Sequence, residues 1–229
     1  MRISELFYSL QGEGKLIGVP SVFVRASGCN LRCVWCDTPY ASWNPEGDNW
    51  TVGAIVDAVA RHPARHVVLT GGEPMIMPDI AELTDAMVGR DYHVTIETAA
   101  TVFKPTNVHL ASMSPKLSNS TPHDREAGKY VRIHDEQRLN PPVIQQFIDS
   151  SPDFQLKFVV SNQKDLAEIN SLLQQLKGWR PSDVQLMPEG IDAATLRARS
   201  GWINDVCKQT GFRYSPRLHV ELYGNRRGT

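Results

Sequence analysis

Three cysteines within eight residues constrain this chain more than any other feature of its sequence. Cys29, Cys33 and Cys36 form a C-x3-C-x2-C pattern, whereas the remaining cysteine, Cys207, lies far along the chain. Three thiolates on one tight loop can bind three corners of an iron–sulfur cube, which leaves the fourth iron open to a small molecule. The pattern therefore predicts a cluster-binding loop, and Gly28 permits an unusual backbone angle beside it.

Two other interpretations of the cysteines stay open at this point. A zinc site usually uses two C-x2-4-C or H-x3-5-H pairs that together supply four ligands. The sequence contains no second pair near the first, and Cys207 stands alone in a stretch with helical spacing. We therefore treat zinc and a chance grouping as the alternatives, and we predict that Cys207 is a small helical side chain and not a ligand.

Composition narrows the class of protein further. A chain of 229 residues with 41% apolar and 21% charged residues is long and apolar enough to fold as one domain, over residues 1–229. Its net charge of −1 argues against nucleic acid or an anionic membrane as a partner. Glu5 interrupts the apolar N-terminus and no apolar run reaches the length of a membrane span, so we expect a cytoplasmic protein with reduced thiols.

Strand-like and helix-like segments alternate along the chain. We predict strands at 3–7, 21–26, 66–70, 92–97, 108–111, 154–160, 184–187 and 218–222, several of them apolar on both faces. We predict helices at 52–61 (with Thr51 as N-cap), 79–90, 142–150, 163–176 and 193–209. This alternation is typical of an α/β fold with a mainly parallel sheet, and the length favours an incomplete, curved (β/α) barrel over a closed one. The irregular stretch 112–140 is expected to be a long functional loop with a short helix.

The cysteine loop resembles that of the radical S-adenosylmethionine enzymes, with Trp35 at the aromatic position before the last cysteine. A second motif, Gly71-Gly72-Glu73-Pro74, follows a predicted strand and resembles the GGEP motif of that superfamily. The resemblance implies a [4Fe-4S] cluster whose open iron binds S-adenosylmethionine. One-electron reduction would then release a 5′-deoxyadenosyl radical.

Other segments resemble one family within that group, the 7-carboxy-7-deazaguanine synthases. They are residues 7–14, Arg25, the Cys36-Asp37-Thr38 sequence, the Ser114-Pro115-Lys116 sequence and the tail 218–229, in the order of the family. The resemblance implies ring contraction of 6-carboxy-5,6,7,8-tetrahydropterin to 7-carboxy-7-deazaguanine with release of ammonia, a carbon–nitrogen lyase step towards queuosine. It further implies an electron donor such as flavodoxin or ferredoxin, and a homodimer.

The family pattern also assigns residues to each ligand. Substrate would contact Leu10, Gln11, Gly12, Glu13, Arg25, Thr70 and the terminal carboxylate of Thr229. S-adenosylmethionine would contact Trp35, Cys36, Asp37, Gly72, Ser114, Pro115, Lys116, Met187, Pro188, Glu189 and Gly190, with Glu97 as a neighbour of its ribose. Mg²⁺ would be held by the hydroxyl of Thr38, as a hard cation that prefers oxygen. No side chain is expected to abstract hydrogen. The planar fork of Arg25 suits a carboxylate, and Gln11 offers both a donor and an acceptor.

Two rival functions are considered. An activase that installs a glycyl radical on a protein would share the cysteine loop but would not need Gln11 and Arg25 to bind a pterin. A non-enzymatic iron–sulfur carrier would not explain the GGEP motif, and such proteins commonly use four cysteines.

Overall fold

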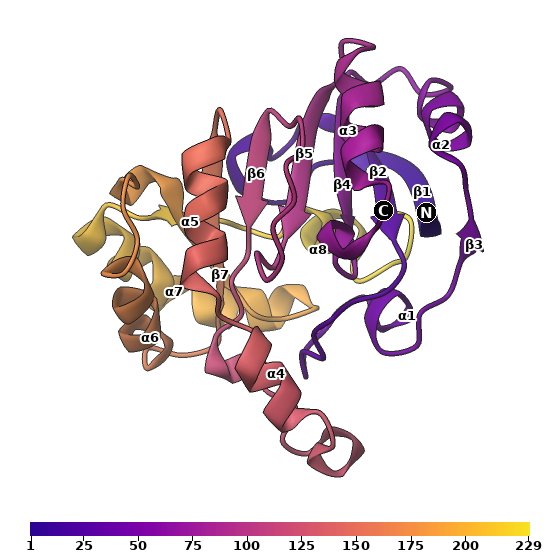
Figure 1. Ribbon diagram of the computed structural model, residues 1–229. Helices are drawn as coiled ribbons and strands as arrows, with labels where there is room; N and C mark the ends of the chain where they lie inside the picture. The colour runs from indigo at the N-terminus through magenta and orange to yellow at the C-terminus, as the bar shows by residue number, and fades with distance from the viewer.

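One open sheet of nine strands organises the chain in the computed structural model, which describes residues 1–229 (Figure 1). The strands run in the order β3-β1-β2-β4-β5-β6-β7-β8-β9. Their bounds are β1 Arg2–Leu10, β2 Pro20–Ala26, β3 Asp48–Asn49, β4 His66–Gly71, β5 His93–Thr98, β6 Leu110–Met113, β7 Phe154–Val160, β8 Val184–Pro188 and β9 Arg213–Tyr214. Only β1 pairs antiparallel, with β2 and β3, and all other pairs are parallel. The predicted incomplete, mainly parallel barrel is confirmed.

Helices connect most of the strands in the expected alternation, but none lies between β5 and β6. They are α1 Pro39–Ser42, α2 Val52–Val59, α3 Ile80–Val88, α4 Val131–Gln137, α5 Pro141–Ser150, α6 Asp165–Leu173, α7 Ala193–Thr210 and α8 Leu218–Tyr223. Thr51 caps α2 as predicted, since its hydroxyl accepts a hydrogen bond of 3.1 Å from the amide of Ala54. α4, the short helix expected within 112–140, projects from the lower edge of the molecule (Figure 1). No helix has the length and apolar character needed to cross a membrane.

The prediction of a strand at 218–222 is wrong. The segment forms α8, in which the amide of Glu221 bonds the carbonyl of Arg217 and the amide of Gly224 bonds the carbonyl of Val220. The alternation of Leu218, Val220 and Leu222 suggested a strand with one buried face, but of these three residues only Val220 is buried.

The two faces of the sheet differ, although several strands carry apolar residues on both faces as expected, among them Phe23, Val159 and Met187 on the inner face. Alternate residues such as Val24, Leu69, Ile96 and Phe158 join the apolar core beneath the helices. Their successors in sequence point the other way because side chains alternate along a strand, and they include Arg25, Thr70, Glu97 and Val159. Lys157, on the other side of Phe158, faces the same way. The sheet thus combines an apolar outer face with an inner face of mixed polar and apolar side chains, and the inner face lines a cavity.

Candidate active site

A cavity of about 510 Å³ lies on the inner face of the sheet, where the parallel strands end. Residues from every predicted site segment line it. These are Leu10, Gln11, Gly12, Glu13, Arg25, Cys29, Cys33, Trp35, Cys36, Asp37, Thr38, Thr70, Gly72, Glu97, Ser114, Lys116, Met187, Glu189, Gly190 and Thr229. Pro115 and Pro188 do not line the cavity, whereas the residues on either side of each proline do. Segments that lie far apart in sequence therefore converge as the resemblance implies.

The GGEP turn packs directly against the cysteine loop. The amide of Gly72 bonds the carbonyl of Ala26 at 3.0 Å, and the amide of Glu73 bonds the carbonyl of Gly28 at 2.9 Å. A Cβ at Gly72 would overlap the carbonyl oxygen of Gly28, and Gly71 has φ +133°, so both positions require glycine. The two glycines thus allow the end of β4 to approach the loop closely.

Glu73 ties this turn to the next strand. Its fully buried carboxylate accepts hydrogen bonds from the Thr98 hydroxyl (2.7 Å) and from the amides of Ala99 (2.8 Å) and Met75 (3.1 Å). Burial raises the pKa of Glu73. The carboxylate fixes the ends of β4 and β5 relative to one another on the rim of the cavity.

The three cysteines form one wall of the cavity, in a loop held from behind. Trp43 donates to the carbonyl of Cys33 (3.0 Å), and Trp35 donates to the carbonyl of Asn119 (3.0 Å). Burial raises the pKa of the Cys29 and Cys33 thiols to about 12. The hydrogen bonds from the two tryptophans fix the position of the loop.

The three thiols do not form a site for a single metal ion. No three His, Cys, Asp or Glu side chains converge where one metal ion could bind them. A cube does not require such convergence, because each thiolate binds a different iron. The structure thus offers no support for the zinc alternative, and Cys207 lies buried in α7 within the apolar core.

The Lys116 side chain lies near Trp35 of the cysteine loop. Its ammonium donates to the carbonyl and to the hydroxyl of Ser114, both at 2.7 Å, and lies 5.9 Å from the centre of the Trp35 ring. The only partners of this cation are neutral. It remains available to an anionic group in the cavity.

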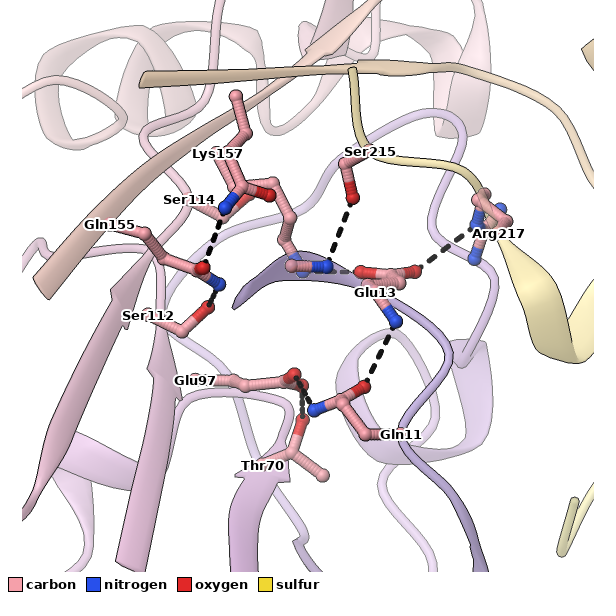
Figure 2. Close-up of polar contacts among 12 residues, drawn as sticks. Gln11, Glu13, Thr70, Glu97, Ser112, Ser114, Gln155, Lys157, Ser215 and Arg217 are labelled. Atoms are coloured by element: carbon pink, nitrogen blue, oxygen red, sulfur yellow. Dashed lines mark hydrogen bonds and ion pairs between the residues drawn. The ribbon is translucent and has the colours of Figure 1, made fainter. Parts of the chain in front are cut away.

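A network of polar side chains forms the other end of the cavity (Figure 2). Glu97 accepts from the amide of Gln11 (3.1 Å) and from the Thr70 hydroxyl (2.9 Å). The carbonyl of the same Gln11 side chain accepts from the backbone amide of Glu13 (3.1 Å). Gln11 therefore bridges β5 and the loop after β1, and its orientation is fixed by both contacts.

Buried charges extend this network (Figure 2). Glu13 forms ion pairs with Lys157 and Arg217, and Arg217 also pairs with Asp37. The side chains of Glu13, Lys157 and Arg217 are only 14%, 6% and 8% exposed. Burial opposes ionisation of Glu13, but Lys157 and Arg217 outweigh it and hold its pKa well below the ordinary value. His219 packs beside this cluster, and burial lowers its pKa, which keeps the ring neutral at pH 7.

Sequence reasoning missed Lys157, Arg217 and His219. One signal was available, because Gln155 and Lys157 place polar side chains at alternate positions of a strand that is otherwise apolar. Polar residues with a period of two indicate a strand face that does not enter the core. Arg217 and His219 follow no such pattern and could not be found in this way.

Arg25 faces the cavity with part of its hydrogen-bonding capacity unused. Its Nε donates to Glu5 at 2.5 Å, and the hydroxyl of Tyr40 donates to the same carboxylate oxygen at 2.8 Å. The two terminal nitrogens of Arg25 bond no protein acceptor. Glu5 therefore fixes the guanidinium from behind and leaves its fork free for an anion.

Comparisons with known proteins agree with this geometry. Residues 23–114 match the Radical SAM superfamily. The chain is 45% identical over 227 residues to the 7-carboxy-7-deazaguanine synthase of Rhodopirellula baltica, an alignment that covers 99% of this chain and 88% of that protein. It is 44% identical to the synthase of the same name from Halobacterium salinarum, with 97% and 90% covered.

Solved structures give the same result for the fold. The crystal structure of QueE from Escherichia coli superposes with a TM-score of 0.71 at 26% identity and covers 95% of this chain and 94% of that one. The structure of Streptococcus suis SuiB bound to S-adenosylmethionine has a TM-score of 0.58 at 16% identity, with 83% of this chain and 48% of that chain covered. At that identity the second match supports the fold alone.

Proposed function

We infer that the cavity described above is the active site of this chain, which belongs to the 7-carboxy-7-deazaguanine synthase family within the radical S-adenosylmethionine superfamily. The enzyme contracts the ring of 6-carboxy-5,6,7,8-tetrahydropterin to 7-carboxy-7-deazaguanine with release of ammonia, a reaction of queuosine biosynthesis. What remains to be assigned is the task of each residue. The glycyl-radical activase and the iron–sulfur carrier are set aside, since neither accounts for this family membership.

The carboxylate of the pterin is proposed to bind Arg25. The observation that carries this assignment is the free guanidinium fork, which Glu5 holds in place from the Nε side. A planar fork matches a carboxylate with two parallel hydrogen bonds. Gln11 and Thr70 each donate a hydrogen bond to the Glu97 carboxylate. We propose that they complement the hydrogen-bonding edge of the pterin, which carries both donors and acceptors. The neighbouring cavity residues are proposed to assist them; these are Leu10, Gly12 and Glu13.

Replacing Arg25 by lysine tests this assignment. Lysine keeps the charge but loses the bidentate geometry, so we expect the dissociation constant of the pterin to rise about tenfold or more. Equilibrium binding in the presence of S-adenosylmethionine and without reductant measures it. Arg61→Lys, at an exposed arginine without an ion pair, serves as the control. Wild-type affinity in Arg25→Lys would refute the role of Arg25.

The opposite end of the cavity is proposed to hold the cluster and S-adenosylmethionine. Cys29, Cys33 and Cys36 would ligate the cluster, while Trp35, Asp37, Gly72, Ser114, Lys116, Met187, Glu189 and Gly190 line the adjoining space, with Pro115 and Pro188 as their neighbours. When bound, this pair supplies one-electron radical chemistry. Lys116 is positioned to neutralise a carboxylate, and the glycine turn lets the ligand approach the backbone. We propose that side chains hold and orient the reactants, exclude water and do not abstract hydrogen themselves.

Mg²⁺ is proposed to bind between Thr38 and the substrate. The Thr38 hydroxyl lines the cavity beside Cys36, and its nearest side-chain partner is the Cys36 sulfur at 3.8 Å. A hydroxyl with no strong partner can serve a hard cation that takes its other ligands from water and substrate oxygens.

We expect turnover to fall when Mg²⁺ is removed by a chelator. Thr38→Ala should lower the turnover rate or weaken its dependence on Mg²⁺. Thr38→Ser keeps the hydroxyl, so it should retain both the turnover rate and the Mg²⁺ dependence of the wild type. Rates measured across a range of Mg²⁺ concentrations distinguish these cases. Full wild-type turnover after complete chelation would rule out the ion.

The reductant is proposed to be an acidic carrier such as flavodoxin or ferredoxin. Three cations surround the outer side of the cysteine loop without a carboxylate partner. Arg32 and Lys129 lie 5.4 and 5.2 Å from the centre of the Tyr130 ring, and Arg125 lies 3.7 Å from that of Trp43. Such a face would attract an acidic partner and orient it towards the cluster. The homodimer, the cytoplasmic location and the single domain 1–229 stay predictions.

A further inference from the structure

The C-terminal segment 224–229 is fastened to the rest of the protein by one side chain. Residues 225–229 line the cavity, and their only backbone hydrogen bond is internal, from the amide of Arg226 to the carbonyl of Gly224. The Thr229 hydroxyl also bonds within the segment. Arg227 alone reaches outward, so its contacts determine where this segment lies.

Arg227 makes four contacts to the first strand and the α1 region. Its Nε pairs with Glu5 at 3.3 Å, one terminal nitrogen pairs with Glu46 at 3.0 Å, and the other donates to the carbonyl of Ser4 at 3.1 Å. Its guanidinium also lies 4.1 Å from the centre of the Tyr40 ring. The side chain is 46% exposed, so each contact is modest, but together they fix the direction of the segment.

Glu5 connects this attachment to the substrate site. One of its carboxylate oxygens accepts from Arg25 and Tyr40, and the other pairs with Arg227. The Glu5 side chain is 11% exposed, which limits competition from water. The arginine proposed to bind the pterin carboxylate and the arginine that holds the tail therefore share one carboxylate.

We propose that Arg227 is a positioning residue for the pterin. It holds segment 224–229 at the cavity, so that the hydrogen-bond acceptors of this segment can meet the amino-pyrimidine edge of the substrate. Positive φ angles at Gly224 (+70°) and Gly228 (+79°) provide the turns on either side. The inference rests on the proposed function, because the pterin is the ligand that the tail would contact.

The test is Arg227→Gln in the cluster-loaded, full-length enzyme. We expect the pterin dissociation constant and KM to rise about tenfold, with kcat within about twofold, because the variant loses the position of an acceptor and not the chemistry. Iron content and S-adenosylmethionine affinity should not change. Arg227→Lys should recover part of the affinity, and Arg213→Gln, at an exposed arginine on β9, should match the wild type.

A second measurement does not depend on turnover. Carboxypeptidase digestion without substrate, followed by intact-mass spectrometry, should release Thr229 several-fold faster from Arg227→Gln than from the wild type. Glu46→Gln should accelerate digestion less than Arg227→Gln does. The double variant Arg227→Gln/Glu46→Gln should be digested at the same rate as Arg227→Gln, because the ion pair between the two residues is already lost in the single variant.

The outcomes distinguish the positioning role of Arg227 from the assignment of the pterin as substrate. Wild-type pterin affinity in Arg227→Gln overturns the positioning role, whatever the digestion shows. Weaker binding after deletion of 228–229, but not in Arg227→Gln, would also overturn it, because the tail would then act without its attachment. If the wild type binds no pterin, the proposed substrate assignment fails, while the digestion rates still decide whether Arg227 holds the tail.

Discussion

Replacing Cys29, Cys33 or Cys36 by serine is expected to abolish turnover. Each thiolate holds a different iron of the proposed cube, and no other cysteine lies on the cavity wall to substitute for it. The variants should therefore contain little iron after anaerobic reconstitution and lose the visible absorption of the cluster. Iron analysis and the electronic spectrum measure this loss directly.

Cys207→Ala provides the matched control. Cys207 is buried in α7 and belongs to the apolar core, and burial raises the pKa of its thiol to about 11. We expect this variant to retain about four irons per chain and near wild-type turnover. Loss of the cluster in Cys207→Ala would overturn the ligand assignment.

Replacing Glu13 by glutamine is expected to have the largest effect on stability. The change leaves Lys157 without its carboxylate in a buried site and removes one of the two partners of Arg217. Removing one member of a buried pair typically costs about 3 kcal/mol or more, which lowers Tm by about 6 °C or more in a chain of this size. Pterin affinity should fall as well, because Glu13 lines the cavity and its ion pairs hold the loop whose amide orients Gln11.

Thermal unfolding of the anaerobically purified variant at neutral pH measures this effect. Glu136→Gln, in an exposed pair with Arg132, should change Tm by little. In the double variant Glu13→Gln/Lys157→Met the loss should be smaller than in Glu13→Gln alone, since no lysine is left unpaired. A Tm for Glu13→Gln equal to that of Glu136→Gln would contradict the network.

The same network predicts the direction of a pH effect. The folded-state pKa values of Glu13 and Asp37 lie below their ordinary values, so folding favours the ionised forms. Their contribution to stability is complete above the ordinary carboxyl pKa of about 4.5 and is lost as the pH falls below it towards the folded-state values. Glu13→Gln should therefore unfold with a shallower dependence on pH in the acid range.

Much of the fold could be predicted from the sequence. Strand and helix patterns of the right length alternate from residue 21 to residue 210, and parallel β-α units follow from that order. The two-residue strands β3 and β9 are too short to carry a pattern. α8 was assigned wrongly because apolar alternation over five residues does not distinguish a strand from an amphipathic helix.

Most of the site residues were predicted in two ways. The spacing of the three cysteines indicates a cluster loop by itself, whereas the glycine turn, Arg25 and Thr70 were assigned through the family resemblance. Arg217 meets Glu13 only after the chain has folded around the whole sheet, and Arg227 meets Glu5 in the same way. Contacts of this range leave no periodicity in the sequence, and only the structure reveals them.

Product analysis shows whether this chain catalyses the ring contraction. The cluster-loaded enzyme is incubated anaerobically with a reductant, S-adenosylmethionine, Mg²⁺ and 6-carboxy-5,6,7,8-tetrahydropterin, and the products are followed by chromatography and an ammonia assay. We expect 7-carboxy-7-deazaguanine and ammonia in equal amounts, with none formed by Cys33→Ser. Failure of a fully loaded wild-type enzyme to form the deazapurine, or product formation by Cys33→Ser, would contradict this expectation.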